Sequence, residues 1–477
     1  MKLLDQLAQR SEAQILRRLE ETGYEAYFVG GCVRDALMGR ECGDVDVTTD
    51  ASPQQVMEVF SDCHVVATGL KHGTVTVEQV EITTFRSDGA YSDGRHPDEV
   101  RFVRSLREDL ARRDFTINAM GCDVRGKLID PYGGREDIAG RIIRTVGDAD
   151  MRFAEDALRI MRGLRFASVL GFEIEEETAA AMIRSSALLK YISPERIFSE
   201  LKKLLAGEAA GDVLRNHVDA LRDVLPELWA MKGFQQHNPH HKYDVLEHCI
   251  RAMEAVVTTA DNVDEMKLAA LFHDSGKPET YFMDDEGIGH FYGHPAKSEA
   301  LVKQLLQRLR ADKATLERVA VLVKYHDLIF DTDERLLKRW MNRLGADVLQ
   351  EILEIKLADN FATGNMSLEL EQKFNDIRHM MVEILEQEQC FSLRDLAVNG
   401  KDLMAEGFSQ GPELGRMLEK LLEAVIDGRC ENDREKLLEL DRRALAQFGT
   451  GPLGQFKQNW SVERLDTRFA EEDGQTG

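Results

Sequence analysis

The sequence is poor in cysteine, in proline and in long apolar runs, and each shortage excludes a class of protein. The 7 cysteines among 477 residues form no Cys-x-x-Cys pair, which argues against a disulfide framework and against a zinc–thiolate site. No run is long and apolar enough to cross a membrane, and the first residues do not begin a signal peptide. We therefore expect a cytoplasmic protein in a reducing compartment, with no membrane partner.

Net positive charge is also lacking. The formal net charge is −24, which argues against non-specific binding to nucleic acid. Arginine is nevertheless concentrated between residues 95 and 165, so any basic face for RNA is expected there. The length predicts about three domains. With 31% charged residues and only 10 prolines, the chain is expected to be rich in helix.

The most informative stretch is YFVGGCVRDALMG, which starts at Tyr27. Its first residues are apolar, as in a short buried strand. Gly30 and Gly31 follow, and without a Cβ their backbone amides can approach a phosphate closely. A short helix is predicted next, with Arg34 and Asp35 in its first turn. The stretch therefore predicts a strand, a glycine loop and a helix that together cradle a phosphate.

Asp44 and Asp46 come shortly after this cradle. In a strand, residues i and i+2 point to the same face, so the two carboxylates are expected side by side. Like charges at that distance raise each other's pKa unless a cation lies between them, and Mg²⁺ prefers oxygen ligands. An isolated Asp-x-Asp pair is more often a polar strand end or turn. Close behind a glycine cradle, it predicts a catalytic magnesium site for nucleotidyl transfer.

The segments GGCVRDALMG and DVDVTT resemble the signature of the class II nucleotidyltransferases, which include the bacterial CCA-adding enzymes and poly(A) polymerases. The stretches at 69–77, 111–120 and 193–201 are also similar to CCA-adding enzymes. The resemblance implies an α+β head with a mixed, polymerase-β-like sheet, followed by all-α domains. It places catalytic Mg²⁺ on Asp44 and Asp46, and nucleotide on Gly30, Gly31 and the helix behind them.

The resemblance covers nearly the whole chain and implies five segments. These are a catalytic nucleotidyltransferase head (1–145), a helical neck and body that recognises the base (146–235), an HD phosphohydrolase-like domain (236–385), a helical tail that binds tRNA (386–450) and a disordered C-terminus (451–477).

Two further parts of the head carry predictions. Glu81 is either a third acid near the metals or a solvated strand residue. The loop at 86–97 is rich in glycine and polar residues, which suits a mobile segment. In the family, a flexible loop at this place is needed to add the terminal A.

The second motif contains Arg112, Arg113 and Asp114. Two arginines offer paired donors to triphosphate or ribose oxygens, and Asp114 can orient an arginine or accept a ribose hydroxyl. The alternative is a helix N-terminus with ordinary surface arginines. The resemblance implies that all three residues bind the nucleotide.

Residues 152–162 are predicted to form one continuous helix in which Asp156, Arg159 and Arg162 share a face. The pattern alone also fits an intrahelical ion pair. The family has a base-reading helix here, so the resemblance implies that Asp156 and Arg159 select CTP and then ATP by pairing with the base edge. Arg162 and Arg196 are expected to support the same pocket.

A second constellation of histidines and aspartates lies between residues 237 and 380. Imidazole and carboxylate ligands at these separations suit a divalent or transition metal that activates water. The segment HDSGKP resembles the HD-superfamily phosphohydrolases, and the alternative is an inherited helical scaffold that only holds RNA. The expected ligands are His248, His273, Asp274, His294, His326 and Asp359.

The expected function is template-independent addition of the 3′-terminal CCA to tRNA from CTP and ATP. Two alternatives stay open, namely a poly(A) polymerase and an HD phosphohydrolase whose head only binds RNA. The sequence leaves the oligomeric state open between a monomer and a homodimer, and it does not identify the metal or the substrate of the HD domain.

Overall fold

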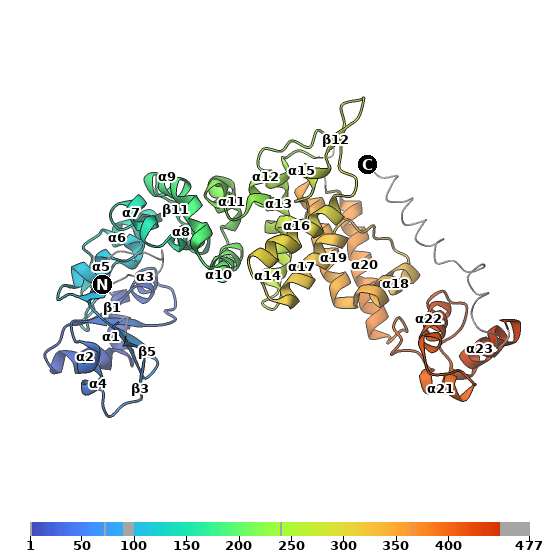
Figure 1. Cartoon of the computed structure of the whole chain (residues 1–477), viewed down its shortest axis with the longest axis horizontal. Helices are drawn as coiled ribbons and strands as arrows, with labels where there is room; N and C mark the ends of the chain where they lie inside the picture. The colour runs from blue at the N-terminus through green and yellow to red at the C-terminus, as the bar shows by residue number, and fades with distance from the viewer. Residues whose placement is uncertain (1, 71–72, 89–99, 239–240, 365, 449–477) are drawn as a thin grey trace. The chain divides into compact units, whose positions relative to one another are not determined.

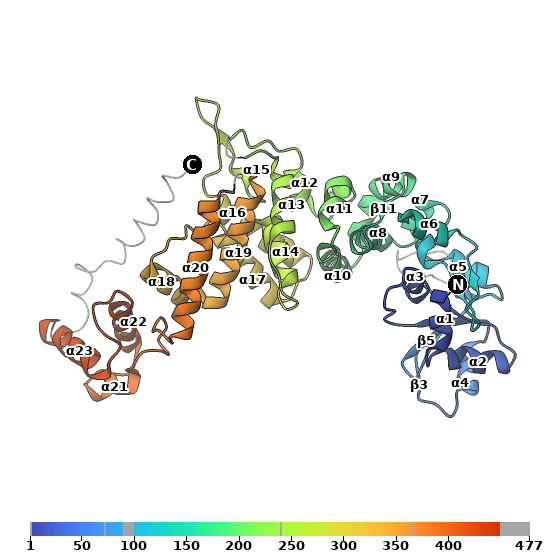
Figure 2. The same ribbon diagram turned by 180° about the vertical axis from the view of Figure 1, so that it is seen from behind.

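The chain is described here by a computed structural model that covers residues 2–70, 73–88, 100–238, 241–364 and 366–448. Its described residues fall into two compact units. Unit 1 comprises Met1–Ala230 and Leu305–Asp312, and unit 2 comprises Met231–Gln304 and Lys313–Gly477. Figures 1 and 2 show the elements of each unit from two sides.

Unit 1 begins with a seven-stranded sheet in the order β3-β4-β5-β2-β1-β8-β9. Only β2 and β5 pair in parallel, and the other neighbours are antiparallel. The predicted mixed sheet of an α+β head is therefore confirmed. The strands are β1 (Ala26–Val29), β2 (Asp46–Thr49), β3 (Val65–Gly69), β4 (Thr74–Val77), β5 (Val80–Thr84), β8 (Gly121–Cys122) and β9 (Leu128–Ile129).

The core of the head lies between this sheet and its first helices, α1 (Lys2–Gln9), α2 (Ala13–Glu21) and α4 (Pro53–Val59). Leu16 and Leu19 of α2 are fully buried against Phe28 and Val47 in the same cluster, as expected for an amphipathic helix. Ser52 starts α4 with a capping box, so the chain turns sharply where β2 ends.

The rest of unit 1 is mainly helical. Its elements are α3 (Gly31–Leu37), β6 (Arg86–Asp88), β7 (Val100–Phe102), α5 (Leu106–Ala111), η2 (Thr116–Asn118), α6 (Gly134–Gly140), β10 (Ile142–Ile143), α7 (Ala149–Glu155), α8 (Leu158–Leu170), β11 (Glu173–Ile174), α9 (Glu176–Ser185), η3 (Ser186–Tyr191), α10 (Pro194–Leu205), α11 (Ala210–His217), η4 (Val218–Leu221) and α12 (Pro226–Met231).

Unit 2 is an assembly of helices with one short hairpin. Helix α13 packs on α14 and α19, and α14 packs on α17. Its elements are α13 (Val245–Ala255), α14 (Val263–Phe272), α15 (Lys277–Thr280), β12 (Phe282–Met283), β13 (Gly289–His290), α16 (His294–Arg308), α17 (Lys313–Tyr325), α18 (Glu334–Leu344), α19 (Ala346–Ala362), α20 (Leu368–Glu386), α21 (Gly400–Ala405), α22 (Pro412–Ile426) and α23 (Arg434–Phe448).

Two sequence predictions about secondary structure are wrong. The domains after the head, expected to be all-α, contain short strands, because β11 pairs in parallel with β10 and β12 pairs with β13. The predicted continuous helix over residues 152–162 is broken at Asp156, which has extended backbone angles (φ −145°, ψ 103°) between α7 and α8. The break arises because the Asp156 carboxylate accepts the backbone N–H of Leu158 at 3.0 Å and so begins a new helix.

The helical remainder expected after the head is otherwise confirmed. The helices nearest the C-terminus, α21 to α23, bury a hydrophobic cluster of their own. In the part of the chain that the structure describes, no helix combines the length and apolarity needed to span a bilayer.

Candidate functional site

Three carboxylates meet at the end of two neighbouring strands of the head. Asp46 is the first residue of β2, and the parallel register of β2 and β5 places Glu81 directly beside it. Asp44 lies two residues earlier and is exposed, like the other two. The pKa of Asp46 is raised, first because the group is partly desolvated and then because Glu81 and Asp44 repel its charge, although Arg113 opposes both. Glu81 thus lies beside the acid that the sequence predicted to be catalytic.

Gly30 is fixed by its backbone and by its neighbours. It has φ 77°, which disfavours a residue with a side chain, and it precedes α3. A Cβ there would lie 3.1 Å from Arg113 Nη1 and 3.6 Å from Asp46 Oδ2. The loop therefore leaves open backbone within reach of both the carboxylates and an arginine. This arrangement can accept a phosphate close to a metal ion.

Arg34 lies on α3 and is held on two sides. Its Nε and Nη2 donate to the Asp35 carboxylate at 2.9 and 3.0 Å. Its Nη1 donates to Asn118 Oδ1 at 2.8 Å, and Asn118 in turn donates to Asp114 Oδ1 at 3.2 Å. The glycine loop and the second motif, 84 residues apart in sequence, are therefore joined by one hydrogen-bonded chain.

Asp109 organises the arginine pair of the second motif, and sequence reasoning missed it. It is fully buried on α5, where Arg112 donates to it at 2.9 Å and Arg113 Nη2 lies 3.7 Å away. Thr48 of β2 also donates to it at 3.3 Å. Its position three and four residues before the two arginines was the available signal.

Arg113 is the arginine nearest the carboxylates. Its pKa is lowered because the group is buried, and attraction to Asp109 and Asp46 offsets only part of that effect. Its Nε is buried and has no hydrogen-bond partner among the described residues. An unpaired guanidinium nitrogen is costly in a protein interior, so this group is placed to receive an anionic ligand.

Asp114 is a buried acid that binds Arg162 across two segments of unit 1. Burial alone would raise its pKa, but Arg162, Asn118 and the Phe115 N–H together lower it to about 2. The Arg162 donors lie 2.8 and 2.6 Å from Asp114 Oδ2. The structure thus places Asp114 and Arg162 together, and the charge of Asp156 also acts on Arg162.

Asp156 and Arg159 do not pair with each other. Arg159 is buried, bonds Glu155 Oε2 at 2.5 Å and donates to the Arg112 carbonyl at 3.0 Å. Asp156 instead accepts from Arg196 Nη2 at 3.3 Å. Since the helix breaks at Asp156, the intrahelical pair that the spacing allowed does not form.

The Asp156–Arg196 pair retains a free donor. Arg196 Nη1 is buried and lacks a hydrogen-bond partner within the described residues. The pair therefore presents one carboxylate and one unsatisfied guanidinium nitrogen. An acceptor beside a donor is what the hydrogen-bonding edge of a nucleobase requires.

An aromatic ring is surrounded by three arginines close to this pair. The guanidinium carbons of Arg34, Arg162 and Arg165 lie 5.3, 5.4 and 4.0 Å from the centre of the Phe166 ring. Arg165 also bonds Glu200 at 2.5 Å. Each arginine is therefore fixed, and the group supplies positive potential for a polyanionic ligand.

The predicted metal ligands of unit 2 converge on two aspartates. His248 Nε2 lies 3.0 Å from Asp359 Oδ1 and 3.3 Å from Asp274 Oδ2. His294 Nε2 lies 3.2 Å from Asp274 Oδ1. All six predicted residues can be grouped into metal-ligating sets whose ligand atoms lie within 4.8 Å of one another, and they are His248, His273, Asp274, His294, His326 and Asp359.

Two lysines, Lys277 (buried) and Lys356 (half-buried), balance the charge of these acids. Lys277 Nζ lies 2.7 Å from Asp274 Oδ2 and donates to Gln236 at 2.8 Å. Lys356 Nζ lies 2.6 Å from the Asp327 carboxylate and 3.4 Å from Asp359 Oδ2. Asp327, which follows His326 in the sequence, is thus a partner of a lysine rather than a member of the cluster.

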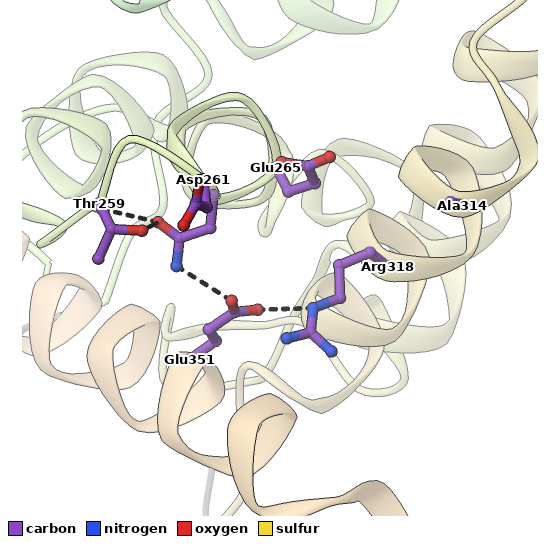
Figure 3. A pocket seen from close by; sticks show the side chains of 7 residues that line it. Thr259, Asp261, Glu265, Ala314, Arg318 and Glu351 are labelled. Atoms are coloured by element: carbon purple, nitrogen blue, oxygen red, sulfur yellow. Dashed lines mark hydrogen bonds and ion pairs between the residues drawn. The ribbon is translucent and has the colours of Figure 1, made fainter.

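A hollow of about 490 Å³ in unit 2 does not involve this cluster (Figure 3). Three of its polar side chains are already paired with one another, because Glu351 accepts from Arg318 at 2.7 Å and from Asn262 at 3.0 Å. We assign no ligand to it. The predicted loop at 86–97 lies largely outside the described residues, from position 89 onward.

Three family descriptions match successive parts of the chain. Residues 26–144 match the poly A polymerase head domain, and residues 171–232 match the probable RNA- and SrmB-binding site of polymerase A. Residues 293–440 match tRNA nucleotidyltransferase domain 2.

Whole proteins match over nearly their full length. The CCA-adding enzyme of Geobacillus thermodenitrificans is 54% identical over 89% of this chain and 94% of its own. That of Lactococcus lactis subsp. cremoris is 35% identical over 90% and 96%. The crystal structure of the Bacillus stearothermophilus CCA-adding enzyme in complex with CTP is similar with a TM-score of 0.65 and 31% identity, over 92% of this chain and 99% of that one.

Proposed function

The chain belongs to the CCA-adding enzymes, and we propose how its residues carry out the reaction of that family. It is a nucleotidyltransferase that adds the 3′-terminal C, C and A to tRNA from CTP and ATP. Metal-dependent catalysis follows from membership of the family. The roles of individual residues are our proposal.

We assign the catalytic Mg²⁺ ions to Asp44 and Asp46, with Glu81 beside them. The observation that carries this assignment is the strand register, which sets Asp46 next to Glu81 two residues after Asp44. The donor set is all oxygen and exposed, as Mg²⁺ requires when it also binds substrate phosphates. When bound, Mg²⁺ lowers the pKa of the attacking tRNA 3′-hydroxyl and stabilises the pyrophosphate that leaves.

The protein's own groups hold the triphosphate and the sugar. The backbone at Gly30 and Gly31, with Arg34 and Asp35, lines the phosphate side. Arg113 lies beside Gly30, with its Nη1 3.1 Å from where a Cβ on Gly30 would stand, so it receives phosphate charge. Asp109 is a positioning residue, because it holds Arg112 and Arg113 without facing the ligand.

Base selection falls to Asp156 and Arg159, with Arg196 and Arg162 in support. Asp156 and Arg196 already offer an acceptor and a free donor. Arg159 is held by Glu155, so its donors reach a base only when that ion pair opens. The change from CTP to ATP is thus coupled to a switch of Arg159 between Glu155 and the base.

The assignment of the carboxylates is tested by Asp46→Asn, with Asp62→Asn as the control. Asp62 is an exposed acid of the same unit that pairs with Arg18. Asp46→Asn should remove several kcal/mol of transition-state stabilisation by the metal. The rate of CTP addition is therefore expected to fall by at least about 10³-fold. tRNA binding, measured by filter retention, stays unchanged in both variants. Activity near that of the wild type in Asp46→Asn would remove the assignment.

We propose a second activity for unit 2, namely metal-dependent phosphoester hydrolysis. The observation that favours it is the convergence of four histidines on two buried or half-buried aspartates. His273→Ala should abolish any phosphatase or cyclic phosphodiesterase activity of the purified protein while CCA addition is retained. His290→Ala is the control, since His290 pairs with Asp284 outside the cluster. If no divalent metal supports hydrolysis, the proposal is wrong and unit 2 is a helical scaffold that only holds RNA.

A further inference from the structure

We propose that Cys32 and Cys42 form a site of reversible oxidation, at which a peroxide joins the two thiols in a disulfide that slows nucleotide transfer. All seven cysteines of the chain are free thiols in the structure. Cys32 directly follows Gly31, and Cys42 lies two residues before Asp44. The effect on transfer rests on the proposed role of the head carboxylates, whereas formation of the disulfide does not depend on it.

The two thiols lie in contact although they belong to different parts of the head. Cys32 is in the first turn of α3, and Cys42 is in the segment between α3 and β2. Cys42 packs against the buried cluster of the head to which Cys32 belongs. The two side chains are hydrogen-bond partners of each other. A disulfide forms between cysteines whose sulfurs can approach without a large backbone movement, and this contact meets that condition.

Other hydrogen bonds hold each cysteine at this contact. The Cys32 thiol donates to the Val29 carbonyl at 3.2 Å, so its sulfur lies at the end of β1. Arg10 Nη1 donates to the Cys42 carbonyl at 3.3 Å, and Arg10 Nη2 pairs with Glu12 at 2.8 Å. Because the two cysteines are fixed in contact, closure of the disulfide needs no search by a flexible loop.

The two thiols differ in their access to solvent. Cys32 is buried, with 2% of its surface exposed, whereas Cys42 is half-buried between the exposed residues Glu41 and Gly43. A small oxidant therefore reaches the Cys42 sulfur first. An oxidised cysteine that has a second thiol beside it condenses to a disulfide, so Cys32 is the resolving thiol.

Hydrogen peroxide supplies the oxidation in two steps. The Cys42 sulfur attacks one peroxide oxygen, the O–O bond breaks, and a sulfenic acid and one water are formed. The Cys32 sulfur then attacks the Cys42 sulfur, the S–O bond breaks, and the hydroxide leaves with the Cys32 proton as a second water. Two thiols thus lose two electrons while one peroxide becomes two waters. A thiol reductant restores both cysteines by exchange, as expected for a sensor in a reducing compartment.

The disulfide affects the proposed metal site through the start of β2. The Asp46 backbone N–H donates a hydrogen bond to the Cys32 sulfur, and Asp46 pairs with Val29 in the sheet. Since an S–S bond is only about 2 Å long, oxidation draws the Cys32 sulfur away from these partners and pulls the segment that leads to Asp44. A displacement of about 1 Å at a reacting site costs on the order of 10²-fold in rate.

The test measures the disulfide and the rate in the same full-length protein. Reduced protein is freed of reductant and treated with a small excess of hydrogen peroxide. One portion is alkylated and digested with trypsin, which cuts after Arg34 and Arg40 and so separates the two cysteines into different peptides. A disulfide between them then appears as a linked pair of peptides in non-reducing mass spectrometry.

A second portion gives the rate of single-turnover CTP addition to tRNA that lacks its last three nucleotides. The rate is measured before oxidation, after it and after treatment with dithiothreitol, which does not reverse methionine oxidation. Cys42→Ala is the test variant. Cys63→Ala is the matched control, because Cys63 is also a half-buried cysteine of unit 1.

We expect the linked peptides of Cys32 and Cys42 in oxidised wild type, a fall in rate on the order of 10²-fold, and recovery with dithiothreitol. Cys63→Ala should behave in the same way, whereas Cys42→Ala should keep its rate after oxidation. Absence of the linked peptides from oxidised wild type would overturn the inference whether or not the variants fold. An equal fall in rate in Cys42→Ala, or linked peptides without a fall in wild type, would overturn the effect on transfer. If the reduced protein adds no CTP, the proposed function is wrong, and the linked peptides alone decide the oxidation site.

Discussion

Asp114 of the candidate nucleotide site is buried and paired with Arg162, so the effect of removing its carboxylate can be calculated. The pKa of Asp114 falls from 3.8 to about 2 in the folded protein, and the group is 8% exposed. A shift of that size corresponds to about 2.5 kcal/mol of folding free energy at neutral pH. Asp114→Asn removes it and leaves Arg162 without its carboxylate partner. We expect unit 1 to be destabilised by about that amount at pH 7.

The pH dependence of this destabilisation shows whether the charge of Asp114 causes it. Since the pKa is lowered on folding, the stabilisation is complete above the unfolded value of 3.8 and is lost as the pH falls toward about 2. The difference between wild type and Asp114→Asn should therefore be roughly halved at pH 3. Other acids titrate equally in both proteins and cancel from the comparison.

The assay is urea unfolding at pH 7 and pH 3. Unfolding of unit 1 is monitored by hydrogen exchange in peptides from that unit. This readout is needed because the two units need not unfold together. Asp150→Asn is the control, since Asp150 forms only an exposed pair with Arg184, and it should cause no measurable change. A difference between wild type and Asp114→Asn that does not change between pH 7 and pH 3 would refute the assigned electrostatic origin.

Three further changes test the account of unit 1. Gly163→Ala places a Cβ 2.8 Å from Phe115 Cζ and should lower the free energy of unfolding by about 1–3 kcal/mol. The control is Gly415→Ala, at an open helical position, which should leave the melting temperature unchanged or raise it slightly. Arg113→Lys should raise KM for CTP and ATP alike, because lysine lacks the Nε donor. If Arg113 had a purely structural role, the substitution would instead change the melting temperature. Asp156→Ala should reduce CTP/ATP discrimination in single-turnover assays more than it reduces the rate with either nucleotide, and unchanged discrimination would contradict the base-reading role.

Local patterns predicted part of the acidic edge of the head. The glycines at 30 and 31 lie between β1 and α3 as expected, but β2 begins at Asp46, so Asp44 lies just outside the strand on which the predicted alternation depended. Glu81 was left between two interpretations because its position beside Asp46 depends on how β2 and β5 pair. Sheet register between strands 35 residues apart is not visible in either strand alone.

The segment at 152–162 shows why the rest could not be predicted. The spacing of Asp156, Arg159 and Arg162 is ideal for one helical face, but each side chain finds a better partner elsewhere. Asp156 binds the Leu158 N–H and Arg196, and Arg162 reaches Asp114, 48 residues away in sequence. Tertiary ion pairs therefore override the local periodicity.

The ligands in unit 2 illustrate the same limit. Their residue types and order predicted a metal site, yet which histidine lies beside which aspartate oxygen is not visible in the sequence. Those contacts depend on how the helices that carry the six residues pack together.

The central claim is tested most directly by incubating the protein with Mg²⁺ and tRNA that lacks its last three nucleotides, and by reading the products at single-nucleotide resolution. With CTP alone, two C residues should be added, and one final A should follow only when ATP is also present. A growing ladder of A with ATP alone would contradict the account and indicate a poly(A) polymerase. A product that stops at CC with both nucleotides would contradict the addition of all three nucleotides by this chain.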